Sequence, residues 1–390
     1  MANNNNKDKC NVPNLRFPEF SGEWEKCKVS ELLDFYSTNS LCWEQLEYDT
    51  ENISNLHYGL IHVGLPTMVN LVQDRLPNIK DGNKPKNYEL CKEGDVAFAH
   101  ASEDTNEVAK AIEFYNLNGR DVICGLHTIH GRDNKDRTVV GFKGYAFSST
   151  AFHNQIRRIA QGTKIYSIST KNFSECYIGI PSKVEQAKIA SLLHLIDERI
   201  VTQNKIIEKL QSLIKGITIL LTAKGKPNTT IAQCLECHSS TLQESEVSHS
   251  GLYKVFGANG LVGYTDMPQM NGDAILIIKD GSGVGTTSYA QGEFSVIGTL
   301  NYLTAISNYD LRYLYFVLSV FNFQSYKTGM AIPHIYFKDY GNAKIFCPPL
   351  SEQKRIANVL GKLESKLCLE QNILASFNLQ KRYLLGQMFI

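Results

Sequence analysis

The sequence predicts an α+β fold with two mixed α/β domains, separated by two long antiparallel helices, in a pseudo-twofold internal repeat. Three observations support this prediction: a duplicated motif, two long segments with apolar residues at helical spacing, and short strand-like runs in between. A chain of 390 residues also suits two domains better than one core.

The duplication sets the organisation of the chain. Residues 178–193 match residues 345–360 at a constant offset of 167, which places Pro181 on Pro348 and Glu185-Gln186 on Glu352-Gln353. The same offset aligns Gly162 with Gly329, Ile165 with Ile332, Ile168 with Ile335 and Lys171 with Lys338. Nearer the two starts, residues 29–36 resemble residues 231–238 at an offset of 202. Each half is therefore a globular block, of its own length, followed by a long helix.

The two long helices are predicted from about Val184 to Leu221 and from about Ser351 to Met388. Proline precedes each segment, glutamate falls in its first turn, and apolar residues recur at spacings of three and four. In a heptad register each segment has one polar residue midway at position a, Gln203 in the first and Glu370 in the second. This pattern favours two helices packed on each other; the alternative is that each packs only on its own domain.

The polar residues at position d indicate the direction of the two helices. A parallel pair would set Arg199 against Lys366 in the seam. Reversing one helix about Gln203 and Glu370 separates the two cations and leaves Glu370 close to both. We therefore predict an antiparallel pair with a polar layer of Gln203, Glu370, Arg199 and Lys366.

Both blocks are predicted to be rich in strands, because short runs of β-branched and aromatic residues alternate with Gly and Asn-Gly. In the first block the runs are 59–63, 95–99 and 121–125, with a helix near 150–159. In the second they are 252–256, 274–278, 294–297 and 300–305, with a helix at about 311–321.

Composition and charge narrow the function classes. Forty Lys+Arg against 39 Asp+Glu give a net charge of +1, which argues against a free-standing, non-specific nucleic-acid binder. The N-terminus lacks an apolar leader and no apolar run is long enough to span a bilayer, so we expect a cytoplasmic chain without membrane contact. Ten irregularly spaced cysteines are then expected to be reduced thiols, most of them buried.

Three motifs that suggest an enzyme are incomplete. Cys234-Leu-Glu-Cys237-His238 has the haem-attachment spacing, but the repeat aligns Phe35-Tyr36 with Cys237-His238. Gly281–Thr286 lacks the Gly-Lys-Ser/Thr ending of a phosphate-binding loop; a turn that approaches a DNA phosphate and a plain turn both remain open. The Pro-Pro pair at 348–349 lacks the polar and aromatic neighbours of an adenine methyltransferase motif. We predict no catalytic, cofactor or metal site in this chain.

The duplicated Pro-(Pro/Ser)-x-x-Glu-Gln-x-x-Ile-Ala motif, the opening 12–24, and the stretches 98–111, 257–264 and 279–285 resemble specificity subunits of Type I restriction-modification enzymes. This resemblance implies two target-recognition domains that each bind one half of a bipartite DNA site, with helices that set the distance between them. It also implies two methyltransferase subunits that use S-adenosylmethionine, and two motor-nuclease subunits that use ATP and Mg. Catalysis and cofactors would then belong to these partners.

With this resemblance the chain divides into five segments. They are a flexible tail (1–12), target-recognition domain 1 (13–178), a central spacer helix (179–222), target-recognition domain 2 (223–345) and a C-terminal spacer helix (346–390).

Base and phosphate contacts require polar and basic side chains in loops that connect strands. The candidates in the first block are Ser102, Glu103, Asp104, Thr105, Lys110, His127, Thr128, His130, Arg132, Arg157, Arg158 and Lys164. Those in the second are Lys254, Asn259, Lys279, Ser282, Thr286, Thr287, Tyr289, Asn301 and Lys327. The alternative for each group is an ordinary solvated loop or helix face.

Two other function classes stay open at this point. One is a stand-alone DNA-modifying enzyme, which would bind S-adenosylmethionine or cleave DNA by itself. The other is a structural coiled-coil adaptor, which would not distinguish one duplex from another. Two unlike blocks on a repeated frame favour a DNA-specificity module over both.

Overall fold

The computed structural model describes residues 11–105 and 107–390, so most of the predicted tail lies outside the described residues. The chain forms two compact units. The first ends at Thr202 and also contains Leu374–Ile390, and the second is Gln203–Ile373. Within the described ranges, no helix combines the length and the apolar character needed to cross a membrane.

The described residues of the first unit form thirteen strands, most of them short. They are β1 (Glu25–Lys28), β2 (Asp34–Tyr36), β3 (Leu46–Glu47), β4 (Ser54–Leu56), β5 (Met68–Asn70), β6 (Asn78–Ile79), β7 (Val96–Ala99), β8 (Ala101–Ser102), β9 (Ala111–Asn116), β10 (Val122–Cys124), β11 (Thr128–Arg132), β12 (Tyr166–Ser167) and β13 (Tyr177–Ile180). Its short helices are α1 (Val29–Leu32), η1 (Trp43–Gln45), α2 (Tyr58–His62), α3 (Phe142–Phe147), α4 (Thr150–Ile159) and α5 (Thr170–Ser174).

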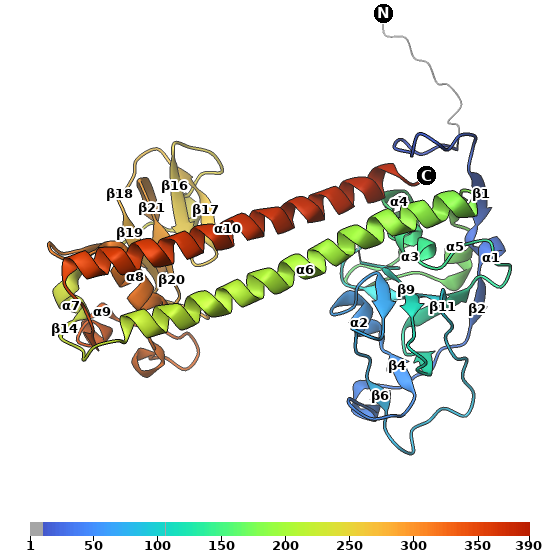
Figure 1. The fold of residues 1–390 in the computed structure, drawn as a ribbon, viewed down its shortest axis with the longest axis horizontal. Helices are drawn as coiled ribbons and strands as arrows, with labels where there is room; N and C mark the ends of the chain where they lie inside the picture. The colour runs from blue at the N-terminus through green and yellow to red at the C-terminus, as the bar shows by residue number, and fades with distance from the viewer. Residues whose placement is uncertain (1–10, 106) are drawn as a thin grey trace, which may run out of the picture. The chain divides into compact units, whose positions relative to one another are not determined.

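Two sheets form the body of the first unit. One has five strands in the order β2-β11-β7-β9-β5, and the other has four in the order β10-β4-β6-β3. The pairs β1-β13 and β12-β8 lie apart from them. Helices α3, α4 and α5 contribute buried aromatic rings to the main core of this unit (Figure 1).

The second unit also has two sheets, in the orders β15-β22-β19-β20 and β17-β16-β21-β18, and a separate β14-β23 pair. The strands are β14 (Thr229–Thr230), β15 (Leu235–Ser239), β16 (Tyr253–Gly257), β17 (Gly260–Thr265), β18 (Met270–Asn271), β19 (Ala274–Ile278), β20 (Thr287–Ala290), β21 (Glu293–Val296), β22 (Leu300–Ala305) and β23 (Lys344–Ile345). The short helices are α7 (Ile231–Cys234), η2 (Glu244–Glu246), α8 (Leu311–Ser319), η3 (Gln324–Tyr326) and α9 (Phe337–Tyr340).

The repeat seen in the sequence is also a repeat of structure. Helices α1 and α7 begin 202 residues apart, at Val29 and Ile231, and each follows a strand paired with the strand before a long helix. One predicted element is wrong: residues 59–63 were expected to be extended, but most of them form helix α2. Its start is fixed by His57, whose ring nitrogen accepts the Gly59 N–H at 3.2 Å.

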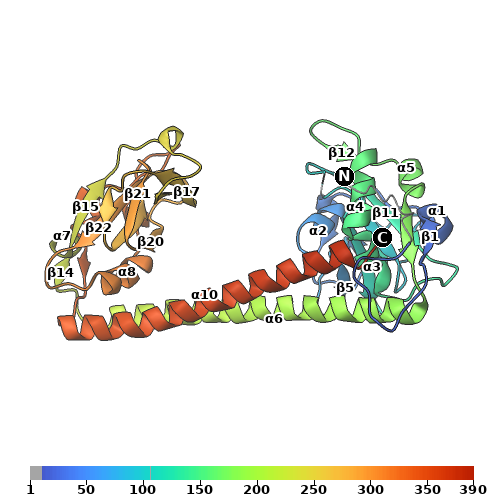
Figure 2. The same cartoon turned by 90° about the horizontal axis from the view of Figure 1, so that it is seen from above.

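The long helices are α6 (Lys183–Thr222) and α10 (Leu350–Gln387), and they run in opposite directions (Figures 1 and 2). In the first unit Asp197 of α6 pairs with Lys381 of α10 at 2.6 Å. In the second unit Gln203 contacts Glu370, and further along α6 Leu221 packs on the core that contains Leu360. Residue numbers rise along α6 as they fall along α10, which confirms the predicted antiparallel pair.

The Gln of the duplicated motif joins each long helix to its own unit. Gln186 donates to the carbonyl oxygens of Pro181 and Arg137 and accepts the Val139 N–H. Its equivalent, Gln353, donates to Pro348 O and accepts the Asp310 N–H. Both side chains are buried, and these bonds satisfy the polar atoms of their amide groups.

Repeat-equivalent carboxylates, about three turns further along each long helix, make a second connection. Asp197 accepts a hydrogen bond from the Tyr145 hydroxyl of α3 at 2.9 Å. Glu364, at the same position of the second copy, accepts one from the Tyr315 hydroxyl of α8 at 2.8 Å and pairs with Arg312. Each long helix therefore has two fixed points on the unit at its own N-terminal end.

The helix pair contains the buried polar contact that the heptads indicated. Gln203 donates to the side chain of Glu370 and, at 3.1 Å, to its backbone oxygen, while Lys366 pairs with the same carboxylate. Arg199 is exposed and does not belong to this layer. The reason is a shift of the buried stripe: Ile207 is buried, whereas Ile206 at position d is 42% exposed.

We expect Glu370→Gln to destabilise the second unit at neutral pH. The ion pair with Lys366, followed by the bond from Gln203, lowers the pKa of Glu370. A carboxylate with a lowered pKa stabilises the fold above its ordinary pKa, and this contribution disappears as the pH falls through the lowered value. The difference in melting temperature between the wild type and Glu370→Gln should therefore shrink as the pH is lowered through the acidic range. Glu208→Gln, an exposed glutamate on α6, is the control and should change little at any pH.

Candidate nucleic-acid interface

Two repeat-equivalent hairpin loops stand out on the surfaces of the two units. The first apolar loop (161–167) is closed by a bridge between Gln161 and Ser167, and the second apolar loop (328–334) by one between Thr328 and His334. Gly162 (φ 137°) and Gly329 (φ 87°) occupy the same place in each. A Cβ there would collide with the carbonyl oxygen of Ile165 or Ile332, so both loops require glycine.

The tips of these loops carry apolar side chains that no folding requirement explains. Ile165 is 62% exposed and Ile332, its equivalent, is 61% exposed; the neighbouring Met330 is fully exposed. Apolar side chains of this kind contact thymine methyl groups or insert between base steps when a protein binds DNA. The sequence contains a signal for these side chains, because the repeat aligns Ile165 with Ile332.

Several candidates predicted in the first block gather around the first apolar loop. Strand β8 pairs with β12, which places Ser102 opposite Tyr166 of the loop; Glu103, Asp104 and Thr105 follow Ser102 in the chain. Lys164 is in the loop itself, and Arg157 and Arg158 end the helix α4 that leads into it; all three are exposed. Lys110 is a nearby cation whose ammonium group bonds the His62 carbonyl and pairs with Glu107 at 2.8 Å. The loop is therefore surrounded by the basic and polar groups that phosphate contacts require.

The first unit also contains a row of aromatic rings that the sequence did not predict, with the buried His57 in its middle. The Trp43 and His57 rings lie 4.3 Å apart, His57 and Tyr58 4.7 Å apart, and Tyr58 meets the exposed His127 at 5.3 Å. Burial and then the proximity of His127 lower the pKa values of His57 and His100, which favours their neutral forms. The row joins residues that are distant in sequence, so no local motif could predict it.

Three residues predicted to bind DNA in the first block are buried instead. Thr128, His130 and Arg132 belong to β11, which is buried along its whole length. Thr128 donates to Gly125 O at 2.6 Å, and His130 and Arg132 both bond the carboxylate of Asp95. Their polar groups are hydrogen-bonded to other groups inside the unit, so the prediction that they contact bases is corrected.

In the second unit the Gly-rich turn lies against the second apolar loop. Gly281 N–H donates to Pro333 O at 2.9 Å, and Ile335 N–H donates to Lys279 O at 3.0 Å. Ser282 and Thr286 on this turn are exposed, and Lys327 precedes the loop. The amides of Val284, Gly285 and Thr286 donate to carbonyl oxygens within the turn itself. The side chains of this turn are therefore available to contact a phosphate, whereas these backbone amides already donate to carbonyl oxygens of the protein.

The remaining candidates in the second block do not join this group. Asn301 is buried and accepts a hydrogen bond from Ser239, so its predicted base contact is corrected. Tyr289 donates to Asp273 and lies under the guanidinium of Arg312 at 4.2 Å, and Thr287 shares its strand β20. Lys254 and Asn259 are exposed, but they lie on the β16-β17 hairpin of the other sheet.

The haem-like spacing at 234–238 does not form a ligand group. Cys234 ends α7, whereas Cys237 and His238 lie on β15. The His238 ring stacks on Tyr302 and bonds the Thr304 hydroxyl at 2.9 Å. Within residues 11–105 and 107–390, one group has the proximity that a metal needs: Cys91, Cys124 and His130 of the first unit.

Comparison with known proteins gives one family. The Type I restriction modification DNA specificity domain matches residues 232–378, which include the second apolar loop and the Gly-rich turn. The chain carries a Type I DNA specificity domain. This finding confirms the family that the motifs indicated.

Three similar proteins agree with the specificity domain. The Type I restriction enzyme EcoprrI specificity subunit of Escherichia coli is 24% identical over 116 residues, which are 30% of this chain and 29% of that protein. The Type I restriction-modification S subunit of M. genitalium has the same fold, with a TM-score of 0.63, 17% identity, and coverage of 97% of this chain and 99% of that one. A structure from work on complex assembly and conformational transition of the type I R-M system has a TM-score of 0.57 at 15% identity, over 93% and 96% of the two chains. The fold of the specificity domain and its helices is therefore that of known S subunits.

Proposed function

We propose that this chain is the DNA-recognition subunit of a cytoplasmic Type I restriction-modification complex. Each unit would bind one half of an asymmetric, bipartite site, and the chain itself would not catalyse a reaction. The observation that carries this proposal is the pair of equivalent apolar loops with unlike surroundings. Arg157, Arg158 and Lys164 flank the first loop, whereas Ser282, Thr286 and Lys327 flank the second. Equivalent loops with different polar neighbours suit the recognition of two different half-sites.

The long helices would bind the partner subunits. In the second unit Ile206, Leu213 and Leu220 recur every seven residues along one side of α6, and they are 42%, 53% and 68% exposed. An exposed apolar row of this kind supports a protein-docking role. We assign it to two methyltransferase subunits, which would bind S-adenosylmethionine and methylate adenine N6. Two motor-nuclease subunits would bind ATP and Mg and complete the complex.

Base recognition by the two loops predicts that variants of each loop alter one half of the methylated motif. Lys164→Ala/Ile165→Ala should relax or abolish recognition of one half-site, and Lys327→Ala/Ile332→Ala that of the other. The loss of a base contact costs about 1–3 kcal/mol of discrimination, and phosphate contacts weaken binding to all sequences alike. The measurement is a genome-wide map of N6-methyladenine in cells that express each variant with its methyltransferase partner.

The methylation map needs two controls, a deletion of the protein and a variant outside the loops. Deleting the protein should remove the motif completely, and Lys344→Ala, an exposed lysine on β23, should leave both halves intact. A genome whose methylated motifs do not change on deletion, in cells shown to contain the complex, would contradict the proposed function. Changes in both halves from either loop variant would contradict the assignment of one half-site to each unit.

A further inference from the structure

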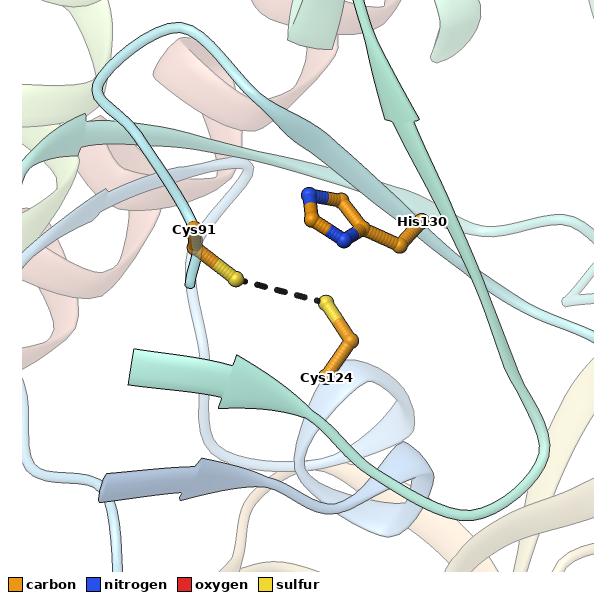
Figure 3. A group of neighbouring side chains, drawn as sticks. All are labelled: Cys91, Cys124 and His130. Carbon is orange, nitrogen blue, oxygen red and sulfur yellow. Dashed lines mark hydrogen bonds between the residues drawn. The ribbon is translucent and has the colours of Figure 1, made fainter. Parts of the chain in front are cut away.

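Three side chains from separate elements meet in the interior of the first unit (Figure 3). Cys91 lies in the segment before β7, Cys124 ends β10, and His130 is in β11. One ligand atom from each, the two sulfurs and a ring nitrogen, all lie within 4.8 Å of one another, and all three residues are buried. The fold alone assembles this group, because the spacing of the three residues matches no metal-binding motif.

The separation of the two sulfur atoms fits a shared cation better than a disulfide bond. Cys91 Sγ and Cys124 Sγ lie 3.6 Å apart. Two thiolates on a tetrahedral zinc ion, each about 2.3 Å from the metal, are about 3.8 Å apart. A disulfide would require about 2.05 Å and therefore a movement of the sulfurs. The backbone holds them in place, since Cys91 N–H donates to Val122 O two residues before Cys124.

The hydrogen bonds of the His130 ring suit it to be the third ligand. Its Nε2 bonds Asp95 Oδ2 at 2.7 Å, and the same carboxylate is held by Arg132 at 2.8 and 2.9 Å. The other ring nitrogen, Nδ1, is buried and has no hydrogen-bond partner among the described residues. A histidine that donates one N–H to a carboxylate and presents its other nitrogen to a metal is the usual arrangement around protein-bound metals. A buried nitrogen without a partner is otherwise costly.

We propose that Cys91, Cys124 and His130 bind one thiophilic d10 cation, Zn²⁺ or Cu⁺. The site is new to the proposed function and does not depend on it. Cys124 belongs to the four-stranded sheet and His130 to the five-stranded sheet, so the cation would join the two sheets of the first unit. Both residues also flank the turn that carries the exposed His127, and the cation would fix its two ends.

Charge and ligand type support this class of cation. Two thiolates balance the charge of Zn²⁺, and the Asp95 carboxylate is already balanced by Arg132. Thiolate and imidazole ligands select Zn²⁺ and Cu⁺ over Mg²⁺ or Ca²⁺, which prefer oxygen. Three protein ligands leave Zn²⁺ one position for a water molecule, whereas Cu⁺ accepts three ligands without a fourth.

The metal content of the full-length chain tests the site. Protein purified with a thiol reductant and without chelator should contain about one equivalent of zinc or copper, and elemental analysis identifies which. Cys91→Ser/Cys124→Ser should reduce this to about a tenth or less. Cys234→Ser/Cys347→Ser is the matched control, because its two buried sulfurs lie 3.9 Å apart. That control should keep the metal.

A second measurement uses only the wild-type chain and therefore does not depend on the folding of a variant. Metal-free protein should bind about one Co²⁺ with thiolate-to-cobalt absorption, and the metal should protect two thiols from alkylation at residues 91 and 124. Purified protein without bound metal that also fails to bind Co²⁺ would overturn the proposal. So would a disulfide between Cys91 and Cys124 in freshly purified protein, or equal metal content in the two double variants.

Discussion

Asp95→Ala is expected to lower the free energy of unfolding of the first unit by about 3–5 kcal/mol, the usual cost of removing one partner from a buried ion pair. Asp95 is 1% exposed and accepts hydrogen bonds from His130, from two nitrogens of Arg132 and from the Lys92 N–H. Burial raises the pKa of Asp95, but the bonds from His130 and Arg132 outweigh it and hold the pKa below its ordinary value. The stabilisation is present at neutral pH and is lost as the pH falls through that lowered pKa.

Tryptophan fluorescence during urea unfolding isolates the first unit, because both tryptophans of the chain, Trp24 and Trp43, belong to it. Asp49→Ala is the control: Asp49 pairs with Arg75 on the surface, where an ion pair contributes about 0–1 kcal/mol. Similar urea midpoints for Asp95→Ala and the wild type would show that the contacts of Asp95 with His130 and Arg132 do not stabilise the first unit.

The long helices and their direction could be predicted because periodicity and duplication are properties of the sequence itself. The paired polar residues Gln203 and Glu370 identified the seam correctly. Arg199 was placed wrongly because a heptad register assigns position d to every seventh residue, while the residues that pack inward, the half-buried Ile200 and the buried Ile207, lie next to that position. The failure at 59–63 has a similar cause, since a short apolar run fits a strand or a helical turn equally well.

Which polar residues face outward could not be predicted, because burial depends on contacts distant in sequence. His130 and Arg132 have the chemistry of base recognition, but Asp95, 35 residues away from His130, binds both inside the unit. The same limit applies to Cys91 and Cys124, which are 33 residues apart and belong to no recognisable ligand motif. Conversely, the exposed isoleucines of the apolar loops resemble ordinary core residues until the fold shows that they are not.

Phe389→Ala is expected to destabilise the first unit by about 3–5 kcal/mol, as large aromatic truncations in a core do. Phe389 belongs to the end of the chain, yet its ring packs at 6.4 Å from Trp24 and 6.0 Å from Phe142. Leu384 and Met388 are buried in the same core, and Leu15 N–H donates to Gln387 O at 2.9 Å. The last residues of the second repeat thus complete the core of the first unit.

The matched control lies on the same helix. Leu379→Ala removes a side chain that is 60% exposed, so its effect should stay within about 0.5 kcal/mol. Trp24 reports on the change directly because it contacts Phe389. Removal of residues 374–390 should abolish the cooperative fluorescence transition, although every residue up to Thr202 remains. A truncated chain with a wild-type transition would show that the first unit folds without the end of the second repeat, and that the antiparallel helices do not stabilise it.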